Sequence, residues 1–469
     1  MAANILTRIL AVWGVILSVA VGIKLLSKQN DTHAATSSSS SSKAAPQTSD
    51  SLEPKSTTSA DLGGSTAEPE QAASLEFTRY TLCAAKHSAS SSWLPDFLEG
   101  TLAVHCGQSV HLLQFDNGRP VRIGQIELHE VNPQGELYPG PVADSDMTDD
   151  GRLDLIIGLR SMVEHQTPSG GAIYLMAAAE RGGLRSPEEL LLANPLQLYA
   201  RRTAPGEAQT LWIAHGRSAH HGNGPQIWAY RKDGSPLRTV AASLPVDARV
   251  LGMADLDLKD GPEILASGAH QGQQGFWWWR VDGVQAEQQT FFPLGQVTGL
   301  AIADVDGGQQ EDAILSGTAL WRIRATANAA PSPEKIEGTE CPTQDNGEAS
   351  ACLMRPSVVD ANRDGFADLV SYGHGGLLLV YGAAGGRFAP PKHMQIEGER
   401  FILQSLDVVA TGSSEATTLI ALITPISDDS SIELATLSLP TELSENTRFT
   451  FSSTPRAIST SSLATIDRL

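Results

Sequence analysis

Four oxygen-bearing side chains stand at positions 1, 3, 5 and 9 of one short loop: Asp360, Asn362, Asp364 and Asp368. Gly365 is at position 6, where a sharp turn needs a residue without a Cβ. Calcium prefers six to eight oxygen ligands, and this spacing can fold several of them around one point. An EF-hand would carry a glutamate at position 12, but this chain has Ser371 there, and the flanking residues are typical of short strands. The pattern therefore predicts a calcium-binding turn inside a β-hairpin.

Three further segments carry related acidic spacing. A second candidate calcium loop contains Asp146, Thr148, Asp150 and Asp154, with Asp144 and Asp149 as additional acids. Its register is open, because the loop is longer than the usual spacing if Asp144 is the first ligand. A third loop offers only Asp304, Asp306 and Asp312, since position 5 is Gly308. In the fourth, between Asp255 and Glu263, the ammonium group of Lys259 can replace a cation.

Each acidic segment is followed by a short apolar strand and a glycine. The four strands read LIIG, ILASG, AILSG and LVSYG, and their glycines are Gly158, Gly268, Gly317 and Gly373. Two more strand–glycine pairs end at Gly107 and Gly216, and a seventh strand, LIALIT, lies near Thr424. By subtraction, successive glycines are 49 to 58 residues apart. Seven units of about 50 residues match the period of a four-stranded propeller blade.

The combination of DANRDGFADLVSYG with GGRFAPP resembles the FG-GAP/VCBS repeat, the blade unit of integrin α-subunit head domains and of many bacterial surface proteins. The resemblance covers residues 77–440 and is most specific at 360–391. It implies an all-β fold, a seven-bladed β-propeller, and it adds the backbone carbonyl of Phe366 to the calcium ligands. Propellers commonly close when a terminal strand completes the opposite terminal blade. Either 77–84 or 448–452 can supply that strand.

The remaining chain divides by composition. Residues 1–26 hold an apolar run, read as one hydrophobic helix that is either a membrane anchor or a cleaved signal peptide with Ser18-Val19-Ala20 as its cleavage site. Residues 27–75, rich in Ser, Thr, Pro and Ala, are expected to form a disordered linker. The propeller is assigned to 76–455 and a C-terminal tail to 456–469. Both readings of residues 1–26 place the propeller in the periplasm or extracellular space, and cleavage would make it a secreted protein.

Four cysteines permit three disulfide pairings, and proximity favours Cys83 with Cys106 and Cys341 with Cys352. Such disulfides would indicate an oxidising compartment, whereas four buried free thiols are the alternative. The sequence contains no CxxC pair, so it gives no indication of a zinc site.

Histidines gather in the loops that follow the repeat glycines, on the face opposite the acidic loops. They form a candidate rim for a metal or an anionic ligand. Its members are His215, His220, His221, His270 and His374. The alternative is that exposed turns tolerate histidine and these side chains never converge. The run Trp277-Trp278-Trp279 is expected to pack between blades rather than to stack on a sugar.

The formal net charge of −20 argues against a nucleic-acid partner. The catalytic signatures GxSxG, HExxH and GxxxxGK[ST] do not occur, and no catalytic or cofactor-binding residue is assigned. The favoured function is a membrane-tethered, calcium-stabilised propeller that binds an unidentified protein or carbohydrate ligand, as an adhesion or ligand-binding module. The alternatives are an exported enzyme acting on polysaccharide and a scaffold subunit of an envelope complex.

Overall fold

The computed structural model of this chain describes residues 74–460, except 85–88, 95, 133–136, 162–170, 181–182, 202–208, 217–224, 233–237, 241–243, 246, 257–261, 283–284, 309, 327–328, 343–351, 374–375, 398–400, 411–416, 426–430, 442 and 444–446. The predicted hydrophobic helix at 1–26 and nearly all of the predicted linker therefore lie outside the described residues. Within the described part, none of the helices has the length and apolar character needed to cross a bilayer.

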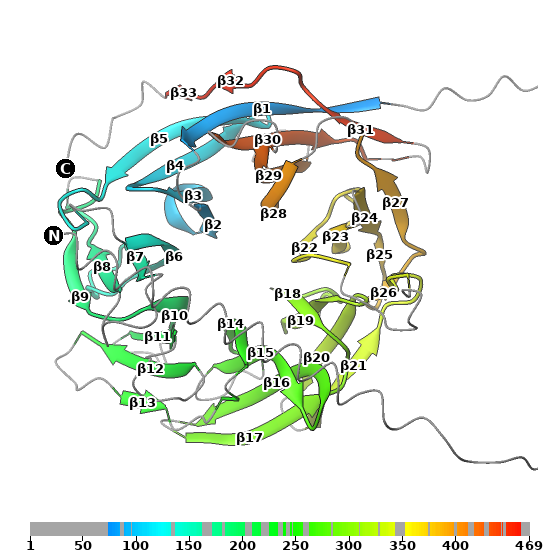
Figure 1. The fold of residues 1–469 in the computed structure, drawn as a ribbon, viewed down its shortest axis with the longest axis horizontal. Helices are drawn as coiled ribbons and strands as arrows, with labels where there is room; N and C mark the ends of the chain where they lie inside the picture. Colours follow the sequence, from blue (N-terminus) through cyan, green and yellow to red (C-terminus); the bar gives the residue numbers. More distant parts are fainter. Residues whose placement is uncertain are drawn as a thin grey trace, which may run out of the picture. The chain divides into compact units, whose positions relative to one another are not determined.

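Seven sheets, each built on four antiparallel strands, form a ring, which confirms the all-β, seven-bladed propeller (Figure 1). Blade 1 contains β2 (Ala89–Leu94), β3 (Thr101–Cys106), β4 (Ser109–Asp116) and β5 (Arg119–Glu127), with the short 3-10 helix η2 (Phe97–Glu99) between its first two strands. Blade 2 contains β6 (Leu137–Ser145), β7 (Asp154–Ser161), β8 (Ala172–Met176) and β9 (Glu188–Leu191). Blade 3 contains β10 (Pro195–Arg201), β11 (Thr210–His215), β12 (Gln226–Arg231) and β13 (Arg238–Val240).

The next three blades repeat the same order, with the first strand innermost (Figure 1). Blade 4 contains β14 (Arg249–Ala254), β15 (Glu263–His270), β16 (Gln273–Asp282) and β17 (Gln285–Phe292). Blade 5 contains β18 (Val297–Ala303), β19 (Asp312–Gly317), β20 (Trp321–Thr326) and β21 (Ala329–Lys335). Blade 6 contains β22 (Ser357–Val359), β23 (Asp368–Gly373), β24 (Gly376–Val380) and β27 (Lys392–Gln395), with the hairpin β25 (Gly382–Ala383) and β26 (Arg387–Phe388) between its last two strands.

Blade 7 closes the ring with strands from both ends of the propeller. Its strands are β28 (Phe401–Ala410), β29 (Thr417–Pro425), β30 (Ser431–Leu439) and, as the fourth strand, the N-terminal β1 (Ser74–Ala84), which runs antiparallel to β30. Strand β31 (Arg448–Phe451) then pairs with β1 in parallel, so both terminal candidates take part. Strand β32 (Arg456–Ala457) also pairs with β1, and β33 (Ser459–Thr460) pairs with β5 of blade 1. Strands thus begin two residues before the expected propeller start and continue into the expected tail.

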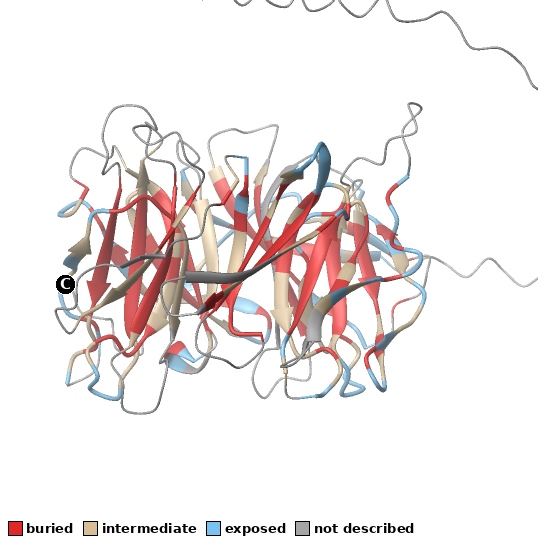
Figure 2. Cartoon of the chain, turned by 90° about the horizontal axis from the view of Figure 1, so that it is seen from below, coloured by how far each residue is buried: buried red, intermediate tan, exposed pale blue. Residues whose placement is uncertain are grey.

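The second strand of each blade is buried on both faces, because its blade is packed between two others (Figure 2). In β7, for example, Leu155 and Ile157 pack with Leu112 of blade 1, whereas Ile156 packs with Ile213 of blade 3. Successive side chains of a strand point to opposite faces, so a continuous apolar run serves two interfaces at once. This explains why the repeats LIIG, AILSG and LIALIT read as unbroken apolar stretches.

The tryptophan run follows the same rule, which confirms the expected core packing. Trp277 and Trp279 join the cluster that holds Trp212 of blade 3, while Trp278 packs against Leu315 of blade 5. All three indoles are at most 5% exposed.

The innermost strand of blade 5 lies close to the segment that leads to blade 6. A Cβ placed on Gly299 of β18 would lie 2.3 Å from the Cα of Arg355, in the segment that leads to blade 6. A glycine is needed there because the backbones of two neighbouring blades approach each other closely.

Both disulfides connect the pairs that proximity favours. Cys83 of β1 is bonded to Cys106 of β3, with 6.5 Å between their Cα atoms, and so links blade 7 to blade 1. Cys341 is bonded to Cys352 in the segment between blades 5 and 6, with a Cα–Cα distance of 5.7 Å. The first of these bonds spans the place where the ring closes.

Candidate functional site

The acidic loops occupy the same position in blades 2, 4, 5 and 6, between the first and the second strand. In each case the last acid of the pattern is the first residue of the second strand: Asp154, Glu263, Asp312 and Asp368. All four of these residues are buried. Because they start strands that are covered on both faces, their carboxylates must find partners inside the protein.

Asp368 of blade 6 connects two segments of its blade. One carboxylate oxygen accepts hydrogen bonds from the backbone N–H groups of Ala361 (2.8 Å) and Asn362 (3.2 Å) in the loop. The other oxygen accepts from the N–H of Gly382 (2.7 Å), where β25 begins. Burial raises the pKa of Asp368 to about 6, and these three hydrogen bonds oppose the rise. Asp368 thus braces the loop against the start of β25, a role that the spacing of the predicted ligands does not indicate.

The other members of the blade 6 loop hold it in its turn. Asp360 accepts from the N–H of Gly365 (3.0 Å), which has a φ of +85° and so suits glycine. Asn362 donates to Asp364 (2.9 Å), and Asp364 accepts from the N–H of Phe366 (2.9 Å), whose side chain is 38% exposed. The loop geometry therefore places the predicted ligands in one turn.

The blade 2 loop repeats this arrangement and resolves its register. Asp146 accepts from the N–H groups of Asp150 and Gly151 (both 3.0 Å), as Asp360 does from Gly365. Asp154 accepts from the N–H of Thr148 (2.9 Å) and, across the blade, from that of Ala178 (2.8 Å). Asp146, and not Asp144, is thus the first position of this loop.

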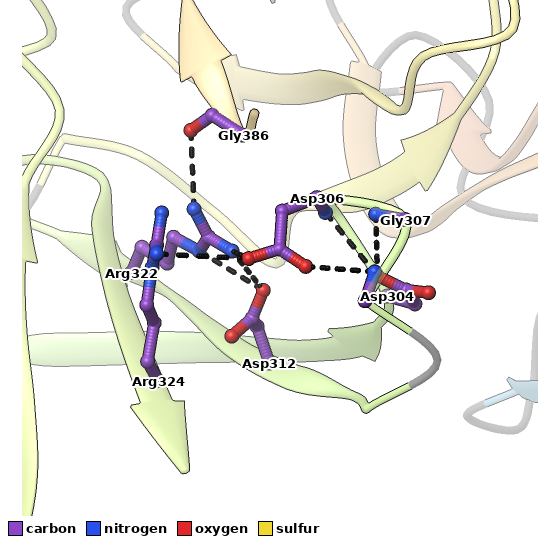
Figure 3. Close-up of polar contacts among 8 residues, drawn as sticks. Asp304, Asp306, Gly307, Asp312, Arg322, Arg324 and Gly386 are labelled. Carbon is purple, nitrogen blue, oxygen red and sulfur yellow. Dashed lines mark hydrogen bonds and ion pairs between the residues drawn. The ribbon is translucent and has the colours of Figure 1, made fainter. Parts of the chain in front are cut away.

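The blade 5 loop differs, because an arginine lies among its carboxylates (Figure 3). Asp304 accepts from the N–H groups of Asp306 (3.2 Å) and Gly307 (2.8 Å). Asp306 and Asp312 both pair with Arg322, whose side chain is 1% exposed. Burial raises the pKa of Asp312, and the hydrogen bond from Arg322 opposes that rise. Two of the three predicted ligands, Asp306 and Asp312, therefore pair with a cation that the spacing did not indicate.

Calcium itself stays a prediction. Among the described residues, no group of three or more His, Cys, Asp or Glu side chains is already arranged to hold a metal ion. The oxygens of blade 6 nevertheless suit a hard cation, because Asp360 Oδ1 is buried without a hydrogen-bond partner and the Asp368 carboxylate is fully buried. Asp360, Asn362, Asp364, Asp368 and the Phe366 carbonyl are the groups that would hold it.

The histidine rim is only partly described, since His220, His221 and His374 lie outside the described residues. His215 is buried, stacks on Trp228 with 4.1 Å between ring centres, and accepts at Nδ1 from the N–H of Asn194 (2.9 Å). His270 packs against Trp277 and Phe291 of its own blade. These two histidines thus serve separate packing contacts in blades 3 and 4.

Acid is expected to destabilise the propeller through its buried histidines. Burial lowers the pKa of His105, His111 and His215 to about 4 from the usual 6.5. Between these two values the unfolded chain binds protons that the folded chain does not, so stability is lost as the pH falls from 6.5 to 4. Each pKa unit corresponds to about 1.4 kcal/mol per histidine. The raised pKa values of Asp144, Asp312 and Asp368 act in the opposite direction and offset part of this loss.

Denaturant unfolding of the full-length chain between pH 7 and pH 4 measures this effect. The His215→Gln variant, with one titrating group fewer, is the matched control and should show a shallower decline. An unfolding free energy that is constant over this range would contradict the expectation.

A groove of about 580 Å³ lies between the outer strands of blade 5 and the β25–β26 hairpin of blade 6. Its walls include the cationic side chains of Arg324, Lys335 and Arg387 and the apolar side chains of Ile336, Phe388 and Pro391. Glu334 and Glu337 also line it, and Lys335 pairs with Glu340 (2.7 Å). The groove thus combines cationic, acidic and apolar side chains.

Comparison with known proteins does not assign this chain to a family. No family model and no curated protein matches the chain. Solved structures that resemble it include a lectin from Agrocybe aegerita, described as recognising non-reducing terminal N-acetylglucosamine, with 16% identity over 68% of this chain and 80% of that chain and a TM-score of 0.42. The Dos1 propeller shares 11% identity over 74% of this chain and 78% of its own, with a TM-score of 0.42. A glucose dehydrogenase shares 15% identity over 66% of this chain and all of its own, with a TM-score of 0.34. These likenesses carry no conclusion about activity.

Proposed function

We propose that this chain is a calcium-stabilised ligand-binding propeller that works outside the cytoplasm and is tethered to the membrane by its N-terminal segment. The observation that carries the calcium assignment is the buried Asp368. Among the described residues, no lysine or arginine pairs with it. It shares its loop with the unpartnered Asp360 Oδ1. A buried carboxylate without a positive partner is costly, and a divalent cation would remove that cost.

Export and adhesion rest on other features. The two disulfides suit an oxidising compartment, and the apolar segment at 9–23 suits an anchor or signal. The FG-GAP resemblance supports a binding role for the propeller.

A binding function is favoured over catalysis because several buried polar side chains make structural hydrogen bonds. His215, Asp154, Asp368 and Arg322 hold strands and blades together through hydrogen bonds. The groove beside blade 5 instead offers exposed cations next to apolar side chains, an arrangement suited to holding an anionic ligand without transforming it.

Calcium is expected to raise the melting temperature of the full-length chain relative to a chelator. Saturation to one hundred times Kd would add about 2.7 kcal/mol per site. The Asp360→Asn/Asp364→Asn variant keeps the hydrogen bonds of Asp368. It should lose the part of the calcium-induced rise in melting temperature that comes from the blade 6 loop. Magnesium serves as the ion control. A melting temperature that is the same in calcium and in chelator would refute calcium stabilisation.

The binding role has its own test, in affinity capture with the full-length chain in calcium and in chelator. The Lys335→Glu/Arg387→Glu variant reverses two charges of the groove and changes no residue that pairs with an acidic loop. Loss of capture by this variant is expected. Turnover of a polysaccharide would instead support the enzyme alternative.

A further inference from the structure

Arg322 of β20 lies beside the blade 5 loop, against Asp306 and Asp312 (Figure 3). Its Nη2 is 2.7 Å from an Asp306 oxygen and also contacts Asp312, and its Nε donates to the same Asp312 oxygen (2.9 Å). These acids hold positions 3 and 9 of the loop, the positions of Asn362 and Asp368 in blade 6. A guanidinium therefore lies between the side chains at two of the three acidic positions of this loop.

The loops of blades 2 and 6 have no arginine at the corresponding place, whereas in blade 4 Arg280 lies 3.8 Å from Glu263. In blade 5, Arg322 pairs in register with Ile314, two residues after Asp312. The residue two places after Asp368 is Val370, which pairs with Leu379, and the residue two places after Asp154 is Ile156, which pairs with Leu175. Two blades thus carry leucine where blade 5 carries arginine.

The next blade is built to receive this arginine. Arg322 Nη1 donates to the carbonyl oxygen of Gly386 (3.1 Å), in the turn of the β25–β26 hairpin. A Cβ added to Gly386 would lie 2.4 Å from Nη1, and the φ of +68° there also favours glycine. The guanidinium is thus hydrogen-bonded in blades 5 and 6, which accounts for a fully buried charge.

We propose that Arg322 is a built-in replacement for the metal ion, so that the blade 5 loop binds no calcium and gains a calcium site when Arg322 is removed. Arg322 pairs with both Asp306 and Asp312, and Arg324 Nη1 lies 3.6 Å from the same Asp306 oxygen, so a divalent cation placed beside these two arginines would be repelled. The residues of this loop therefore do not fit calcium as they stand. This inference deepens the calcium part of the proposed function and assigns different cations to different blades.

The test is calcium titration calorimetry of the full-length chain. Arg322→Leu, which copies blades 2 and 6, should bind one more calcium equivalent than the wild type. Arg322→Leu/Asp306→Asn should lose that extra equivalent, and Arg324→Leu, which removes a neighbouring cation 3.6 Å from Asp306, should not gain it. An Arg322→Leu variant with the stoichiometry of the wild type would overturn the proposal.

A second measurement decides the question even if Arg322→Leu does not fold. Asp306→Asn in the wild-type background should leave the calcium stoichiometry unchanged, and a loss of one equivalent would show that the loop binds metal despite Arg322. The wild-type titration separates the two proposals. Absence of any calcium binding refutes the proposed calcium stabilisation, whereas the gain in Arg322→Leu alone decides the role of Arg322.

Discussion

Replacing Asp368 by alanine is expected to lower the free energy of unfolding by about 4 kcal/mol, measured in chelator. The carboxylate satisfies the N–H groups of Ala361, Asn362 and Gly382 at a site closed to water. Each buried donor left unpaired costs about 1 to 3 kcal/mol. Denaturant unfolding of the full-length chain measures the loss.

Two variants separate this bracing role from calcium binding. Asp364→Ala removes a predicted ligand whose hydrogen bonds are local and exposed, so in chelator it should cost less than about 1 kcal/mol. Asp368→Asn keeps one side-chain oxygen, so its loss of unfolding free energy should lie between the losses of Asp368→Ala and Asp364→Ala. If Asp368→Ala and Asp364→Ala were equally stable in chelator, Asp368 would be a ligand without a bracing role.

Replacing Arg79 by methionine is expected to destabilise the closed ring by about 3 to 5 kcal/mol, because it leaves a buried charge unpaired. Arg79 of β1 donates two hydrogen bonds to Glu433 of β30, at 2.6 and 3.0 Å, and the two side chains are 8% and 3% exposed. The same arginine reaches the carbonyl oxygen of Ser452 (3.3 Å), just after β31. It therefore joins the N-terminal strand to both C-terminal neighbours.

The double variant Arg79→Met/Glu433→Met is the control for this prediction. Since it removes both charges, it should recover much of the stability lost by Arg79→Met alone. The matched surface pair is Arg448 with Glu397, whose side chains are 57% and 44% exposed, so Arg448→Met should cost at most about 1 kcal/mol. Equal losses in Arg79→Met and Arg448→Met would contradict a closing role for Arg79.

Much of the fold could be predicted because its signals are local. The seven second strands and their glycines recur within short windows, and each strand is apolar throughout because both its faces are buried. The turn of each acidic loop is also local: Asp360 reaches Gly365 and Asp146 reaches Gly151, five residues along the chain in both cases. Contacts between residues this close in the chain leave a recognisable spacing in the sequence.

Other parts of the site left no such signal. The brace from Asp368 to Gly382 spans 14 residues, and its partner is a backbone N–H that any residue but proline provides. The place of the histidines in the repeat predicts a shared rim, whereas the side chain of His215 is turned towards Trp228 and Asn194. Side-chain direction within a blade depends on packing, which a list of loop residues does not contain.

By itself the sequence determined the repeat, the number of blades and the carboxylates of the acidic loops, because these depend on residues close together in the chain. Only the tertiary structure showed that Arg322 lies against the acids of blade 5 and how the ring closes. Arg322 meets a glycine 64 residues away, and Arg79 meets a glutamate 354 residues away. Strand register and blade packing bring such partners together, and neither leaves a fixed spacing in the chain.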